Sequence, residues 1–121
     1  MSYLDGFVLP VPKKNLAAYR KLARAAGKVW RKHGALDYRE CLGDDLENHW
    51  GGIPFMKLAG AEPGETVAFS FIVYKSRAHR DLVNARVGKD PFMNDPKYKD
   101  KPMPFDLKRQ AYAGFKVIVK V

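Results

Sequence analysis

The stretch Val67-Ala-Phe-Ser-Phe-Ile-Val-Tyr-Lys-Ser-Arg-Ala-His-Arg-Asp81 decides the fold, because it reads as a strand running directly into a helix. Two sets of side chains alternate along the strand: Val67, Phe69, Phe71 and Val73 on one face, and Thr66, Ala68, Ser70, Ile72 and Tyr74 on the other. Ser76 follows at once, and its hydroxyl suits a helix N-cap because it can accept from the free amides of the first turn. The helix predicted from it turns His79, Leu82, Val83 and Val87 inward and ends near Gly88.

Outward from this stretch, the same criteria predict a helix over 13–33 and strands over 3–11, 36–42 and 111–121. The helix has apolar side chains at three- and four-residue spacing, and Gly34 is a natural stop after it. Gly27 inside the helix indicates close packing of helix on sheet, since glycine otherwise costs roughly 1 kcal/mol there. Pro10 and Pro12 are expected to end the first strand, because proline cannot donate to a ladder. Long connections over 43–64 and around Pro91 to Pro104 separate the elements.

The element order is therefore β-α-β-β-α-β, which predicts an α+β fold of the ferredoxin-like kind. We expect a four-stranded antiparallel sheet with both helices on one face. The strands carry apolar residues on both faces, more than two helices can cover. A second copy with its sheet facing the first is the simplest cover, so the sequence predicts a homodimer.

The chain has 121 residues, and we interpret 1–121 as a single domain with a modest core. Hydrophobic residues make up 46%, and no apolar run approaches the roughly 20 residues that a membrane span needs. No basic segment followed by an apolar one marks a signal peptide at the N-terminus. The single cysteine, Cys41, cannot form an internal disulfide, so we expect a reducing, cytoplasmic location without membrane association.

The net charge of +9 is unevenly distributed along the chain. Residues 1–34 carry +7, residues 35–66 carry −5 and the remainder carries +7. Such a balance indicates either an anionic partner or a solvated basic face, and the second is the more common case.

Several motifs resemble those of the YbaA-like family, which contains the domain of unknown function 1428. The matching segments are Asp5-Gly-Phe-Val-Leu-Pro-Val-Pro12, Tyr38-Arg-Glu-Cys41, Tyr74-Lys-Ser-Arg-Ala-His-Arg-Asp81, Met103-Pro-Phe-Asp106 with Lys108-Arg109, and Tyr112-Ala-Gly-Phe115. The resemblance covers essentially the whole chain; it implies a dimeric α+β barrel and no established activity. The loop from Leu46 to Ala61 departs most from the family pattern, and Ala113 stands where glycine is more usual.

His79 and Asp5 are the candidate catalytic residues. His79 follows the N-cap by one turn, where the positive end of the helix dipole favours a neutral imidazole. Asp5 is a carboxylate on an otherwise apolar strand face and needs a partner. Arg39, Arg77 or Arg109 could supply that partner. The alternative for both is structural: a half-buried histidine bonded to a neighbouring strand, and a fold-specifying ion pair.

Tyr74, Arg77 and Arg109 are the candidate ligand-binding residues, near the end of the strand where free helix amides could hold an anionic or carbonyl group. The spacing of Asp44, Asp45 and His49 matches no metal motif, so we expect no metal. No phosphate loop or dinucleotide fingerprint is present, and no cofactor is expected.

Two functions remain open at this point. The first is a homodimer that binds or transforms a small metabolite, in one interpretation an anionic one, between sheet and helices; the residues leave open whether it is an enzyme. The second is nucleic-acid binding by the basic face of the first helix, which we expect to be weak and non-specific because phosphate contacts read no bases. A structural dimer without chemistry is the third alternative.

Overall fold

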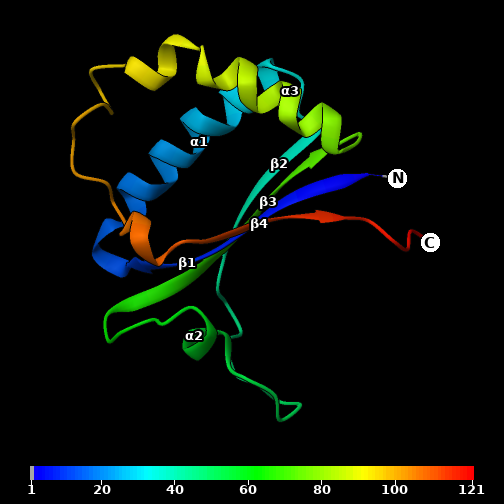
Figure 1. The fold of residues 1–121 in the computed structure, drawn as a ribbon. Helices are drawn as coiled ribbons and strands as arrows, with labels where there is room; N and C mark the ends of the chain where they lie inside the picture. Colours follow the sequence, from blue (N-terminus) through cyan, green and yellow to red (C-terminus); the bar gives the residue numbers. More distant parts are fainter. Residues whose placement is uncertain (1) are drawn as a thin grey trace.

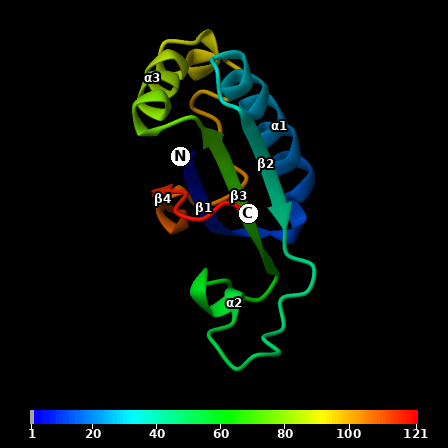
Figure 2. The same cartoon turned by 90° about the vertical axis from the view of Figure 1, so that its right-hand side faces the viewer.

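The structure, a computed structural model, describes residues 2–121. Its elements follow the order β1 (Tyr3–Pro12), α1 (Leu16–Lys32), β2 (Asp37–Leu42), α2 (Phe55–Leu58), β3 (Glu65–Tyr74), α3 (Arg77–Gly88) and β4 (Ala111–Lys116). The strands form one antiparallel sheet in the order β2-β3-β1-β4. Helices α1 and α3 lie on one side of this sheet, and α2 lies on the other (Figures 1 and 2). The α+β class and the four-stranded antiparallel sheet are therefore confirmed.

The junction between β3 and α3 has the predicted form. Ser76 is the N-cap of α3, and its hydroxyl accepts from the His79 backbone N–H at 3.1 Å. Val83 and Val87 of α3 are buried, as predicted. The inward position of Leu82 is wrong, because this side chain is 48% exposed. The face that packs on the sheet includes Arg80 instead, three residues before Val83 and seven before Val87.

Helix α1 approaches the sheet closely at Gly27, as predicted. A Cβ atom at Gly27 would lie 2.7 Å from the Tyr38 ring on β2, so only glycine leaves room for that ring. Gly34 follows the helix with φ of 117°, in the left-handed region that favours glycine. Both glycines therefore serve the placement of α1 against β2.

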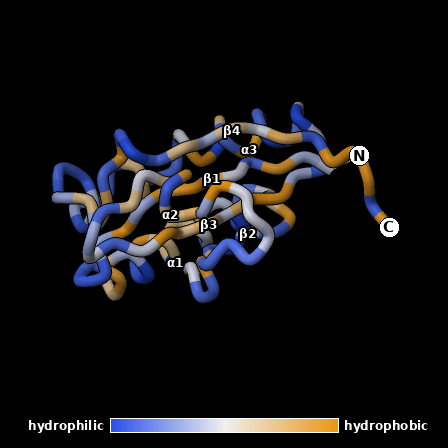
Figure 3. The backbone as a smooth tube through the Cα atoms, turned by 90° about the horizontal axis from the view of Figure 1, so that it is seen from below, coloured by the Kyte–Doolittle hydropathy of each residue, from blue (hydrophilic) through white to orange (hydrophobic). Residues whose placement is uncertain are grey.

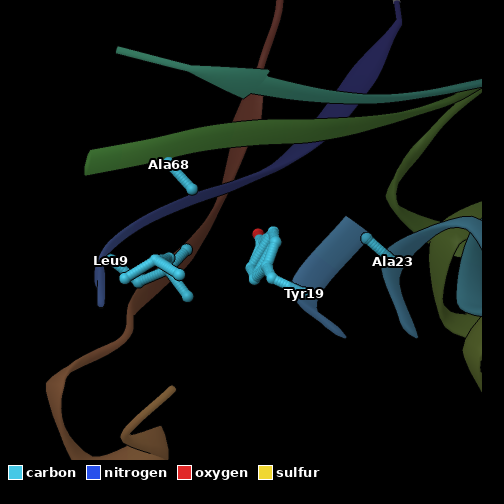
Figure 4. Packing of buried hydrophobic residues seen from close by; sticks show 5 residues of the cluster. Leu9, Tyr19, Ala23 and Ala68 are labelled. Carbon is cyan, nitrogen blue, oxygen red and sulfur yellow. The ribbon is translucent and has the colours of Figure 1, made fainter. Parts of the chain in front are cut away.

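Two hydrophobic clusters fill the layer between the helices and the sheet face beneath them, which we call the covered face. One contains Leu9, Val11, Tyr19, Ala23 and Ala68. Figure 4 shows Tyr19 pointing from α1 toward the strands that carry Leu9 and Ala68. The other contains Ala35, Ile72, Tyr74, Val83 and Val87. Each large buried side chain contributes about 1.5–3 kcal/mol, so these clusters hold α1 and α3 on the sheet.

The opposite sheet face, which we call the open face, is only partly covered. Phe55 of α2 packs edge-on against Phe69, with ring centroids 6.4 Å apart. Even so, Phe69 is 45% exposed, and Phe115 on β4 is 58% exposed. Seen from this side, apolar residues run along β1 and β3 (Figure 3). Apolar residues on both faces were predicted, and the structure confirms that the chain's own helices leave the open face incompletely covered.

The last strand is shorter than predicted. Strand β4 ends at Lys116, which pairs with Tyr3, and Val117 N–H then donates to the Ser2 carbonyl at 2.9 Å. Strand β1 begins at Tyr3, so residues 118–121 find no further ladder partner. Their alternating apolar pattern is real, but a strand needs a neighbour to pair with.

The first strand, in contrast, continues through Pro10 to Pro12. Pairing with β4 stops at Val8, so from there on β1 has a neighbour on one side only. Proline is tolerated at such an edge because no donor is needed there. No helix within residues 2–121 has both the length and the apolar character needed to cross a bilayer.

Candidate functional site

Asp5 lies under α3 with Arg80 as its partner, not Arg39, Arg77 or Arg109 as expected. Arg80 Nη1 donates to Asp5 Oδ1 at 2.7 Å, and the two side chains are 13% and 2% exposed. Arg80 was not expected here, because α3 was predicted to turn Leu82 inward. Arg80 and Leu82 flank opposite edges of the inward face of α3, and a small rotation of the helix decides which of them packs on the sheet.

Three aromatic side chains complete this cluster. Arg80 Nη1 donates to the Tyr112 hydroxyl at 3.1 Å and Nη2 to the Tyr3 hydroxyl at 3.4 Å, and the guanidinium lies 5.0 Å from the Tyr3 ring centre. Tyr74 is fully buried, and its hydroxyl donates to Asn84 Oδ1 at 3.4 Å. Burial, and then the negative charge of Asp5, raise the pKa of Tyr74 above its ordinary value. The polar groups of this cluster are therefore paired with one another.

His79 and Arg77 lie at the start of α3. His79 Nδ1 accepts from the Lys75 backbone N–H at 3.0 Å, and its ring meets Tyr74 edge-on with centroids 6.0 Å apart. Arg77 is exposed. The imidazole therefore closes the turn between β3 and α3 and uses one ring nitrogen to do so.

Arg109 lies at the other end of β3. It donates to Glu65 Oε1 and Oε2 at 2.7 and 2.8 Å and to the Gly60 carbonyl at 2.6 Å. The hydrogen bond from Arg109 lowers the pKa of Glu65 to about 2. Glu65 pairs with Pro12, whereas Tyr74 pairs with Tyr3, so the length of β3 separates Arg109 from the other candidates. Asp5 and Tyr74 thus lie together, and Arg109 does not join them.

A cavity of about 370 Å³ lies elsewhere on the covered face, between the sheet, α1 and the 91–110 segment. We call it the inner cavity. Its walls are formed by Phe7, Leu9, Tyr19, Leu22, Ala23, Ala26, Trp30, Tyr38, Glu40, Ser70, Ile72, Phe92, Met93, Met103, Phe105, Leu107 and Gln110. Most of these side chains are apolar, and the volume is in the usual range for small-molecule sites. None of Asp5, Tyr74, Arg77, His79 and Arg109 lines it.

The polar wall of the inner cavity is a Tyr-Glu-Tyr cluster. Glu40 of β2 accepts from the Tyr19 hydroxyl at 2.7 Å through Oε2 and from the Tyr38 hydroxyl at 3.0 Å through Oε1. Burial raises the pKa of both phenols, and the Glu40 charge and hydrogen bonds raise them further. Both tyrosines therefore remain neutral donors to Glu40, which lines the inner cavity.

An open groove of about 1180 Å³ adjoins this cluster along the outer side of α1 and β2. We call it the outer groove. Its α1 wall carries the basic side chains Arg20, Lys21, Arg24, Lys28 and Arg31. Glu40 is its acidic lining residue.

The sequence predicted a ligand between sheet and helices, but the residues expected to hold it do not line the inner cavity. Two signals were available. Glu40 lies two residues after Tyr38 on β2, so the two side chains share one face of the strand. Tyr38 pairs with the buried Ile72, which places this face on the covered side of the sheet. Apolar Met93, Met103 and Phe105 in a proline-rich loop also indicated that this loop packs inward.

The charged residues Asp44, Asp45 and His49 of the 43–64 connection are exposed. His49 Nε2 lies 3.4 Å from Asp45 Oδ1, and both side chains are exposed. Across residues 2–121, no three His, Cys, Asp or Glu side chains gather in a way that could hold a metal ion.

Comparison with known proteins places the chain in a family. The family model described as "Protein of unknown function (DUF1428)" matches residues 2–107. "Uncharacterized protein YbaA" of Escherichia coli K12 is 38% identical over 122 residues, covering 98% of each chain, and the protein of that name from Shigella flexneri matches equally well. Among solved structures, "De novo designed protein Foldit4" aligns over 97% of this chain and 99% of its own with a TM-score of 0.46 and 8% identity. The chain therefore belongs to the DUF1428 family, as its motifs predicted.

Proposed function

We propose that the chain is a homodimeric, ferredoxin-like α+β barrel protein that binds or transforms a small molecule in the inner cavity. The observation that carries this proposal is the combination of a mostly apolar 370 Å³ cavity with the Tyr-Glu-Tyr cluster on one wall. Apolar walls supply affinity, and a few fixed polar groups supply orientation. The strand order and the placement of α1 and α3 support the ferredoxin-like topology.

The ligand in this proposal has an apolar body. Leu22, Trp30 and Met93 line the cavity together with other apolar side chains, so a ligand gains mainly by removing apolar surface from water. Glu40 accepts from one neutral phenol at each of its two carboxyl oxygens. A hydroxyl on the ligand could donate to it.

Binding of 1-octanol tests the proposal, because this probe has an apolar chain and one hydroxyl. We expect it to raise the melting temperature of the wild-type protein and to give saturable binding by titration calorimetry. Ala26→Phe fills the cavity and should abolish binding, because Ala26 lines the inner cavity from α1. Ala18→Phe is the matched control, since Ala18 lies on the exposed side of the same helix.

The proposal fails if 1-octanol leaves the wild-type melting temperature unchanged. It also fails if Ala26→Phe and Ala18→Phe bind the probe equally well, since the probe would then lie outside the inner cavity. Circular dichroism of both variants checks that each is folded.

The second candidate function is weak, non-specific binding of nucleic acid by the basic face of α1. It is supported by the exposed side chains of Arg20, Arg24 and Lys28. These side chains border a groove and not a flat surface, which favours a small ligand over a polymer. An RNA titration at low and at physiological salt tests it: we expect steep weakening with salt, and a salt-resistant, sequence-selective complex would favour this second function.

A further inference from the structure

The inner cavity and the outer groove meet at one set of residues. Tyr19, Ala23, Tyr38 and Glu40 line both. The hydrogen bonds from Tyr19 and Tyr38 to Glu40 join α1 to β2 at this boundary. These four residues form the wall that the two spaces share, so a ligand reaches from the inner cavity into the outer groove only by passing between their side chains.

The two spaces differ sharply in character. The inner cavity is mostly apolar, whereas the α1 wall of the outer groove carries five basic side chains. Arg20, Arg24 and Lys28 follow one another at four-residue spacing, so they form one row along α1. The groove thus provides positive charge directly beside an apolar cavity.

Most of this positive charge is not neutralised by the chain. Within residues 2–121, no carboxylate lies within ion-pair distance of Arg20, Lys21, Arg24 or Lys28; the salt bridges involve other side chains. Arg31 donates to the backbone carbonyls of Ala35 and Leu36, in the connection between α1 and β2. Glu40 is the one acidic lining residue of the groove, and it is already bonded to two phenols. A net positive wall remains for an anion.

We propose that the natural ligand is an anionic amphiphile, such as a molecule with an apolar chain or ring system and a carboxylate. Its apolar part occupies the inner cavity, and its anionic group lies in the outer groove against the row of Arg20, Arg24 and Lys28. This inference rests on the proposed function, because it assigns the ligand class of the same site. Arginine suits the role, since its guanidinium forms paired hydrogen bonds with a carboxylate.

Three probes with the same eight-carbon chain test the charge preference: octanoate, 1-octanol and octylammonium, each below the concentration at which it aggregates. We expect octanoate to bind the wild-type protein about tenfold more tightly than 1-octanol, in line with the gain from one charge-assisted hydrogen bond. Octylammonium should bind more weakly than 1-octanol, because the basic row repels it. The preference for octanoate should shrink as salt screens the row.

Arg24→Glu reverses one charge at the centre of the row. We expect it to weaken octanoate binding at least about tenfold and to leave 1-octanol binding unchanged, because only the charged group reaches Arg24. Lys97→Glu makes the same charge change at an exposed residue that lines neither space, and it should leave both affinities as in the wild type.

The outcomes separate the two proposals. If 1-octanol binds in the inner cavity but octanoate binds no better, or if Arg24→Glu and Lys97→Glu weaken octanoate equally, the amphiphile inference is overturned and the proposed function stands. If none of the three probes binds the wild-type protein, the proposed function fails and the inference fails with it.

Discussion

The two faces of the sheet have similar apolar content, but they differ in how completely the helices bury them. On the covered face, α1 and α3 bury even a carboxylate, Asp5, because α3 brings Arg80 to it at 2.7 Å. On the open face, Phe69 and Phe115 remain 45% and 58% exposed, because α2 reaches only one end. The strands alone do not distinguish these faces. What each face can do depends on which helix the connections place over it.

The largest expected effect comes from the covered face. Asp5→Ala removes the buried carboxylate that pairs with Arg80 and leaves the 63% exposed Asp81 as its remaining ionic partner. We expect the free energy of unfolding to fall by about 3 kcal/mol, the lower end of the loss for breaking a buried pair. Urea denaturation measures it. Arg39→Ala is the matched control, because Arg39 pairs with Asp37 at the surface, where the two side chains are 65% and 41% exposed, respectively. We expect this variant to lose less than about 1 kcal/mol of unfolding free energy.

The double variant Asp5→Leu with Arg80→Met sharpens this result. Removing both charges leaves neither unpaired, so the double variant should recover a large part of the stability that Asp5→Ala loses. If Arg39→Ala costs as much as Asp5→Ala, burial of the pair is not what makes it important.

The next effect concerns the open face and the proposed dimer. Phe115→Glu places a charge where a second sheet would pack, and we expect it to weaken dimerisation at least about 30-fold, the loss typical of an interface hot spot. Light scattering measures the mass. Leu82→Glu is the control, since Leu82 is 48% exposed on α3 and lies away from the open face. A wild-type protein that is monomeric at micromolar concentration would contradict the dimer itself.

The smallest effect returns to the covered face, at the Tyr-Glu-Tyr cluster. Glu40→Gln should lower the pKa of Tyr19 and of Tyr38, which ultraviolet pH titration detects. Both should stay above the usual value near 10, because burial is the larger cause of the increase. The free energy of unfolding at neutral pH should fall by about 1 kcal/mol.

The alkaline pH dependence gives a second measure of this cluster. A tyrosine whose pKa is raised on folding stabilises the protein below its unfolded pKa near 10, and this contribution is lost as the pH rises further. In the alkaline range, the free energy of unfolding of Glu40→Gln should therefore fall less steeply with rising pH than that of the wild type. Glu47→Gln, in the exposed 43–64 connection, should titrate as the wild type does.

The sequence by itself determined the strands β1, β2 and β3 and the helices α1 and α3, because their signals are local. Alternation marks β3, the hydroxyl of Ser76 caps α3, and Gly27 and Gly34 have backbone or contact requirements that only glycine meets. The family could also be identified from the chain alone, since its motifs are linear. These features need no knowledge of distant neighbours.

Only the tertiary structure decided the partners. Arg80 and not another arginine meets Asp5 because the rotation of α3 on the sheet selects it. Strand β4 ends at Lys116 because β1 provides no further partner. The inner cavity depends on how the 91–110 segment folds over Glu40 and Tyr19, residues far from it in the chain. Long-range packing chooses among local possibilities that are nearly equal in energy, and a single sequence does not display that choice.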